Sequence, residues 1–234
     1  MTVNYTWEHN GNDTLIWLDD FPGASVRGDS REAALGKAAQ ELASYLRWRD
    51  GTAPAEALTF SMRRDYAVGL QVADADSDSL LDCERVPLTA EDYERLKELA
   101  LRSAACFAAL YASIPDKTLC LTRRRQTFYG QVPSSAEEMY RHTKNVNAYC
   151  FAQIGIDADN DPDILTCREE GFRRLERQPD FLQNPVIEGD YDELWSLRKL
   201  CRRFIWHDRI HGKAMYRQAI RRFGAENIAN PFCF

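Results

Sequence analysis

The spacing of apolar residues in the first fifty positions changes from alternation to helical periodicity. Apolar and polar residues alternate at the N-terminus, and two further short apolar runs follow, separated by turn-forming residues. Three strands are therefore expected, over residues 3–8, 14–18 and 24–27. From Ser30 to Trp48 apolar residues recur every three or four positions, which predicts one helix that ends before Gly51. A further strand is expected over residues 67–72 and a solvated acidic loop over residues 74–79.

Beyond residue 87 the pattern becomes helical throughout. Helix-start residues followed by apolar stripes occur four times. The expected helices cover residues 89–114, 134–155, 161–175 and 191–223. Four amphipathic helices in such a length predict a four-helix bundle. The fold class is thus α+β, with a small module of sheet and helix over residues 1–86 and a bundle over residues 87–234.

Two histidines interrupt the apolar stripe of the last predicted helix. His207 and His211 are four residues apart, so both rings project from the same helix face, the one that also presents Phe204 and Ala214. His142 has the same unusual position in the second helix. A polar side chain on an interior stripe needs a hydrogen-bonding partner or a metal.

These three histidines suggest a divalent metal site. Three imidazoles from two helices can hold such an ion inside a bundle and leave a fourth position for water or substrate. Each histidine alone has a simpler interpretation as a hydrogen-bonded core residue. A zinc-protease motif is excluded because Asp208 stands where a glutamate would be required.

The bundle resembles the DinB-like superfamily of small metalloproteins. The resemblance rests on His142 in the second helix and on the pair His207 and His211 in the fourth, and it covers about residues 88–224. It implies a bound zinc or nickel ion and a metal-dependent transferase or hydrolase, in some relatives an S-transferase that uses a small thiol. A small-molecule substrate is implied with it, and a homodimer is left open.

The first fifty residues resemble the HicB-like domain. The resemblance rests on Phe21-Pro22-Gly23, and on Gly28-Asp29-Ser30 before an alanine-rich helix start. It implies an accessory module for packing or dimerisation, or an antitoxin-like surface for a protein partner.

Three polar residues one turn from a histidine are candidate catalytic groups. Glu138 precedes His142 by one turn and could be an outer carboxylate, although the first turn of a helix also favours an exposed glutamate through the helix dipole. Asn145 follows His142 and could orient water or substrate. Arg203 precedes His207 and could attract an anionic substrate, whereas Asp208 is expected to project to another side of the helix.

Charge and cysteine usage narrow the functional class. Residues 1–86 have 8 basic and 15 acidic side chains, a net charge of −7, whereas residues 87–234 have 22 and 21, a net of +1. This balance argues against a nucleic-acid partner, and the basic residues of the last helix are expected on a solvated, salt-bridged face. Seven scattered cysteines and the lack of a signal or membrane-spanning pattern predict a cytoplasmic protein with no membrane partner. The alternative to an enzyme is a non-enzymatic binding or stress-response module whose metal is structural.

Overall fold

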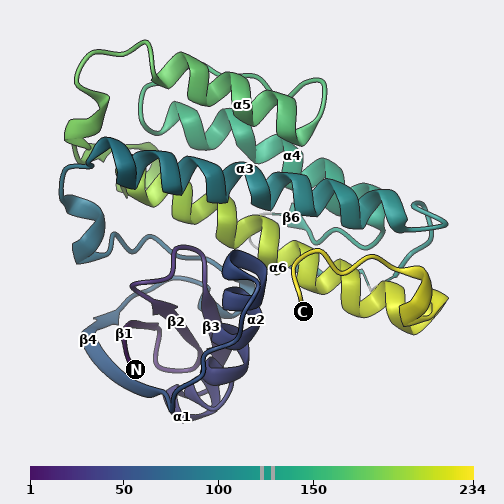
Figure 1. The fold of residues 1–234 in the computed structure, drawn as a ribbon. Helices are drawn as coiled ribbons and strands as arrows, with labels where there is room; N and C mark the ends of the chain where they lie inside the picture. The colour runs from purple at the N-terminus through teal and green to yellow at the C-terminus, as the bar shows by residue number, and fades with distance from the viewer. Residues whose placement is uncertain (122–123, 128–129) are drawn as a thin grey trace.

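A computed structural model describes residues 1–121, 124–127 and 130–234. The fold is α+β: a four-stranded sheet comes first in the chain and long helices follow (Figure 1). The strand order is β3-β2-β1-β4, with β1 antiparallel to β2, β2 antiparallel to β3, and β1 parallel to β4. The strands are β1 (Thr2–His9), β2 (Thr14–Leu18), β3 (Ser25–Gly28) and β4 (Thr59–Ala67). The first three strands confirm the prediction from the apolar pattern.

Two helices connect β3 to β4, where one helix was predicted. They are α1 (Arg31–Leu35), capped by the Ser30 hydroxyl, and α2 (Ala38–Asp50), which ends at Gly51 in a left-handed conformation. Gly36 separates them, and glycine is a poor helix former because it loses more backbone entropy than other residues. The break allows both short helices to bury their apolar residues in the core.

The strand predicted over residues 67–72 is wrong. The fourth strand lies earlier, as β4, and Val72–Asp74 is a 3₁₀ helix. β4 is an edge strand whose side chains are exposed or half-buried on both faces. It therefore lacks the apolar alternation that marked the first two strands.

The predicted helices of the second part of the chain are present. They are α3 (Ala90–Ser113), α4 (Ala136–Ala152), α5 (Ile164–Leu175) and α6 (Leu197–Phe223). Helix α3 packs along α6 and α5, and α4 packs on α5 and α6 (Figure 1). Short hairpins lie between them, formed by β5 (Gln126–Thr127) with β6 (Gly130–Gln131) and by β7 (Ile187–Glu188) with β8 (Leu194–Trp195). Single 3₁₀ turns occur at Asp82–Arg85, Phe181–Gln183, Asp190–Asp192 and Ala225–Asn227.

Helix α6 begins at Leu197 rather than at Tyr191, where the sequence pattern placed its start. Tyr191 and Asp192 have positive φ angles of 60° and 58°, which a right-handed helix does not accommodate. Leu194 and Trp195 then pair with β7, and the Ser196 hydroxyl caps the helix by accepting from the Lys199 amide.

Helix α6 lies between the sheet and the other helices, and it is buried on more than one side. Leu200, Phe204 and Ile205 are fully buried in a core that also contains residues of the sheet and of α2. Lys199, Arg202 and Arg209 are also buried, so the expectation of a solvated basic face is wrong for these three residues. Lys199 pairs with Glu193, whereas Arg202 and Arg209 each pair with a buried glutamate of the first 86 residues.

Those two ion pairs attach residues 1–86, referred to below as the sheet region, to α6. Arg202 Nε lies 2.5 Å from Glu84, and Arg209 Nη2 lies 2.9 Å from Glu41. Buried charges are tolerated when they are paired, which explains why basic residues can occupy the interior side of this helix.

None of the helices among the described residues combines the length and the apolarity needed to cross a bilayer.

Gly23 provides a test of how tightly the turn after β2 packs on α6. Its φ angle is +84°, and an added Cβ would lie 2.5 Å from Ile205 Cγ2 and 2.8 Å from the backbone nitrogen of Trp206. We expect Gly23→Ala to lower the free energy of unfolding by about 2–5 kcal/mol, since backbone strain and overpacking add. Gly11→Ala is the matched control, because Gly11 has a φ of +89° and open space around it. Equal losses for both variants, measured by urea unfolding, would contradict the close approach to α6.

Candidate metal centre

The three histidines singled out by the sequence meet in space. His142 is in α4, and His207 and His211 are one turn apart in α6, which packs against α4. Each ring offers one nitrogen to a common point, and these three nitrogens all lie within 4.8 Å of one another. All three side chains are half-buried. The packing of α4 against α6 therefore brings the three rings together.

The distance between two nitrogens of the group is that of two ligands of one ion. The Nε2 atoms of His142 and His207 are 3.2 Å apart, and the three pairs of ring centroids are separated by 4.4–5.0 Å. Two ligands of a tetrahedral zinc ion, each at about 2.0–2.1 Å, lie roughly 3.3 Å from one another. Among the residues that the structure describes, no further His, Cys, Asp or Glu belongs to the group. A resident ion would thus have three protein ligands.

Burial and mutual repulsion keep these imidazoles neutral. Burial lowers the pKa of His142, and it lowers the pKa of His211 to about 3, with a smaller contribution from the charge of His142 and then from Arg27. The pKa of His207 is also well below its usual value, first through burial and then through the neighbouring His211 and His142. Neutral imidazole is the form that binds metals, so the group is prepared for a cation at neutral pH.

The two ring nitrogens of His207 have different surroundings. Its Nε2 atom faces His142, whereas its Nδ1 atom is buried and has no hydrogen-bond partner among the described residues. An ion held by Nε2 would leave Nδ1, on the other edge of the ring, to a water molecule. The set of three imidazole donors fits a divalent ion of the zinc or nickel type.

The depressed histidine pKa values predict acid sensitivity of the metal-free protein. In the unfolded chain His211 takes up a proton below about pH 6.5, whereas in the folded chain it stays neutral to about pH 3, so the free energy of unfolding falls as the pH decreases from 6.5 towards 3. The slope is about 1.4 kcal/mol per pH unit for each such histidine. We expect His211→Gln to flatten the pH dependence of the unfolding free energy by this amount between pH 6 and pH 4. Parallel curves for the variant and the unmodified chain would show that His211 is already protonated in the folded state.

Glu138 has a structural role at the start of α4. Its Oε2 atom accepts hydrogen bonds from the Ser134 amide and hydroxyl and from the Ser135 amide. The Ser135 hydroxyl accepts in turn from the Glu138 amide, so these two residues form a capping box. The hydrogen bonds from Ser134 lower the pKa of the Glu138 carboxyl. A carboxylate engaged in this way is a poor proton acceptor, and it positions α4 instead.

Asn145 lies beside His142 at an open hollow. The hollow has a volume of about 440 Å³ and is lined by residues of α4 together with Gln131, Val132 and Pro133. His142, Asn145 and Glu138 are all part of its lining. Asn145 itself is exposed, so its amide is available to a molecule that enters from this side.

Arg203 lies near His207, as its position one turn earlier suggested. Its guanidinium stacks over the Trp206 ring at 4.9 Å and donates to the Ser77 carbonyl at 3.1 Å. Its charge contributes to the low pKa of His207, after burial and the other two histidines. The three-histidine group therefore has the Arg203 guanidinium as a cationic neighbour, and Ser77 and Trp206 hold this guanidinium in place.

Asp208 is not a surface residue. It is fully buried and pairs with Arg168 of α5, which lies 2.5 Å away and is also fully buried. The sequence placed Asp208 away from the histidine face, which is correct, but gave no partner for it. Arg168 lies on the same side of α5 as the buried Phe172 and Leu175, and no local pattern points to its partner, which is 40 positions away in the sequence.

Comparison with known proteins gives no match: no family model, no curated sequence and no solved structure matches the chain. The resemblance to DinB-like and HicB-like proteins thus remains a prediction from the residues.

Proposed function

We propose that this protein is a metal-dependent enzyme of DinB-like type, in which His142, His207 and His211 hold a divalent zinc or nickel ion. The observation that supports this proposal is the convergence of three neutral imidazole nitrogens within 4.8 Å, on two helices in the interior of the molecule. In this proposal α3, α4, α5 and α6 form the four-helix bundle of that superfamily, and the sheet region is its HicB-like accessory module.

A fourth, open position favours catalysis over a purely structural metal. Structural zinc sites usually have four protein ligands, whereas catalytic sites keep three and leave one position to water or substrate. The described residues offer three ligands, and one of them, His142, lines an open hollow. The substrate is therefore a small molecule that can reach this ion.

The reaction class follows from the chemistry of such a centre. A divalent ion held by three imidazoles supplies a Lewis acid that makes a water molecule or a small thiol nucleophilic near neutral pH. Transfer to a thiol and hydrolysis are the two reactions that this chemistry supports.

Residues of the chain contribute orientation and charge. The Asn145 amide can hydrogen-bond a substrate in the hollow, and the Arg203 guanidinium favours a substrate with negative charge. Glu138 is assigned to helix capping rather than to proton transfer.

The open position can be tested with cobalt. Co²⁺ replaces zinc in three-histidine sites and absorbs visible light according to its coordination. We expect the Co²⁺-loaded protein to change its visible spectrum when azide or 2-mercaptoethanol is added, because either can occupy the fourth position. An unchanged spectrum, with Co²⁺ bound stoichiometrically, would indicate a closed structural site and would favour the non-enzymatic alternative. His207→Ala is the control, which should lose the spectrum altogether.

A further inference from the structure

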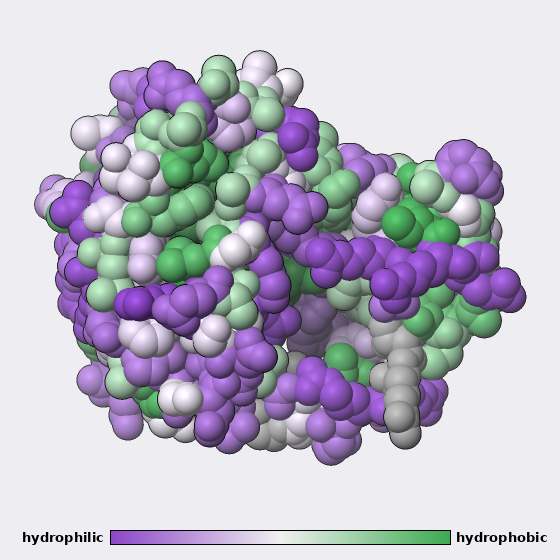
Figure 2. Space-filling model, turned by 90° about the horizontal axis from the view of Figure 1, so that it is seen from below, coloured by the Kyte–Doolittle hydropathy of each residue, from purple (hydrophilic) through white to green (hydrophobic). Residues whose placement is uncertain are grey.

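A second and larger pocket lies between the sheet region and the C-terminal half of α6. Its volume is about 740 Å³. Figure 2 shows the molecule hollowed between a rounded mass and an arm, with hydrophilic side chains along the border of the hollow. The pocket is lined by residues of β2, β3, α2 and α6 and by the C-terminal Phe234. The first 86 residues therefore supply 11 of the 18 residues that line this cavity.

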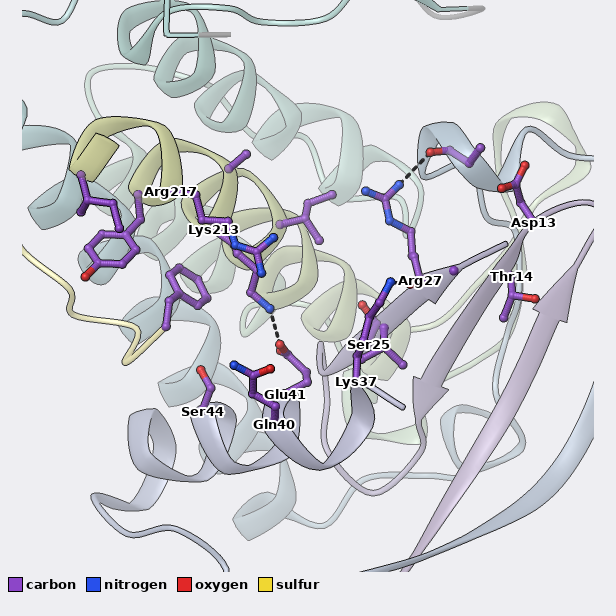
Figure 3. Close-up of a pocket in the computed structure, with 18 residues that line it drawn as sticks. Asp13, Thr14, Ser25, Arg27, Lys37, Gln40, Glu41, Ser44, Lys213 and Arg217 are labelled. Carbon is purple, nitrogen blue, oxygen red and sulfur yellow. Dashed lines mark hydrogen bonds and ion pairs between the residues drawn. The ribbon is translucent and has the colours of Figure 1, made fainter. Parts of the chain in front are cut away.

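The lining is positively charged. It contains four basic residues, Arg27, Lys37, Lys213 and Arg217, and two acidic ones, Asp13 and Glu41, a net of +2. Glu41 is already neutralised, because Lys213 pairs with it (Figure 3) and Arg209 does so as well.

Two of the cations in the lining have no carboxylate partner. Lys37 donates to the Arg27 carbonyl at 2.7 Å, and within the described part of the chain neither Lys37 nor Arg217 forms an ion pair. Like charges gathered in a cavity repel one another, and an anion would relieve this repulsion.

Ser44 gives the second observation. Its side chain belongs to the pocket lining and is 6% exposed, yet its hydroxyl has no hydrogen-bond partner among the described residues. Ser44 and Gln40 point from α2 towards Lys213 and Arg217 on α6 (Figure 3). An unpartnered hydroxyl at a cationic pocket is a ready donor to an oxyanion.

The pocket adjoins the three-histidine group along α6. Ile210 and Ala214, which precede and follow His211 by one and three residues, both line it. The larger pocket and the three-histidine group therefore share the same stretch of α6.

We propose that the pocket binds a small anionic ligand that carries a carboxylate or phosphate group, through the cations Lys37 and Arg217 and the Ser44 hydroxyl in its lining. This anion site is separate from the hollow that His142 and Asn145 line. The sheet region would then form part of a ligand site rather than serve only for packing.

The test measures anion binding by the full-length, metal-free protein. Calorimetric titrations with inorganic phosphate and with succinate, in a buffer without other oxyanions, compare the unmodified chain with Lys37→Gln, Arg217→Gln and Ser44→Ala. Arg47→Gln on α2 and Arg221→Gln on α6 are matched controls, because both arginines are exposed and lie outside the pocket lining. A preference for phosphate or for succinate identifies the type of anionic group.

We expect at least one probe to bind, with affinity about tenfold or more lower in Lys37→Gln and Arg217→Gln and unchanged in the two controls, since each lost contact is charge-assisted. Ser44→Ala should weaken binding severalfold without lowering the melting temperature, because it removes a hydroxyl that has no partner in the free protein. Binding of neither probe, equal weakening in the controls, or binding that appears only after metal is added would overturn the assignment. Anion binding with this pattern in a chain that binds no metal would refute the proposed function and leave the pocket assignment intact.

Discussion

Replacing His207 by alanine is expected to abolish tight binding of a divalent ion. The unmodified protein loaded with zinc or nickel should contain one ion per chain. The variant should bind the ion at least about 100-fold more weakly, because one of three ligands is lost. Even the loss of a residue that only hydrogen-bonds to a ligand lowers metal affinity by about 10–100-fold. His142→Ala and His211→Ala should behave in the same way, since all three nitrogens belong to one group. The measurement is metal content by mass spectrometry together with competition against a chelator of known affinity.

His9 is the matched control for this experiment. It is the chain's fourth histidine, and it pairs with Asp65 at 2.8 Å and stacks on Trp7 at the end of β1. His9→Ala should leave the stoichiometry and affinity unchanged. Metal content that falls equally in His9→Ala and His207→Ala would indicate general damage to the fold, and metal content that falls in neither would remove the three histidines as ligands.

The largest expected loss of stability comes from Asp208→Ala. Removing this carboxylate leaves the Arg168 guanidinium unpaired at a site with no exposed side-chain surface, next to the Phe204 ring at 4.2 Å. Breaking a buried ion pair from one side typically costs about 3–5 kcal/mol, because the remaining charge is desolvated without compensation. The free energy of unfolding should therefore fall by about this amount in urea denaturation.

Two further variants separate the lost charge from a general effect of substitution. Glu91→Ala breaks the exposed pair with Arg95 and should cost about 1 kcal/mol or less. The double variant Arg168→Met with Asp208→Leu removes both charges and should be more stable than Asp208→Ala. If the double variant is the less stable of the two, the unpaired arginine is not the cause of the loss.

The histidine positions could be predicted because helices have a fixed repeat. A residue that shares a stripe with Phe204 must lie on the side that Phe204 faces, so the interior positions of His207 and His211 followed from spacing alone. The same argument placed His142. That these two stripes meet at one point depends on the packing of α4 against α6, and spacing within a helix carries no information about it.

The errors arose where tertiary contacts override local pattern. β4 is held by pairing with β1 although its side chains are mostly exposed, and the start of α6 is set by the β7–β8 pairing and by Ser196. The buried arginines of α5 and α6 follow from carboxylates far away in sequence, such as Glu41 for Arg209. A prediction from the spacing of apolar residues places every basic residue on the exposed side of its helix. It therefore could not predict these ion pairs or the pocket between α2 and α6.

The most direct test of the three-histidine centre is X-ray absorption spectroscopy of the zinc-loaded protein, which reports the type, number and distance of the atoms around the ion. We expect three imidazole nitrogens at about 2.0–2.1 Å and one further light atom that exchanges when azide is added. Zinc surrounded by sulfur, by carboxylate oxygens without imidazole, or by an unchanged set of ligands in His207→Ala would contradict a centre formed by His142, His207 and His211.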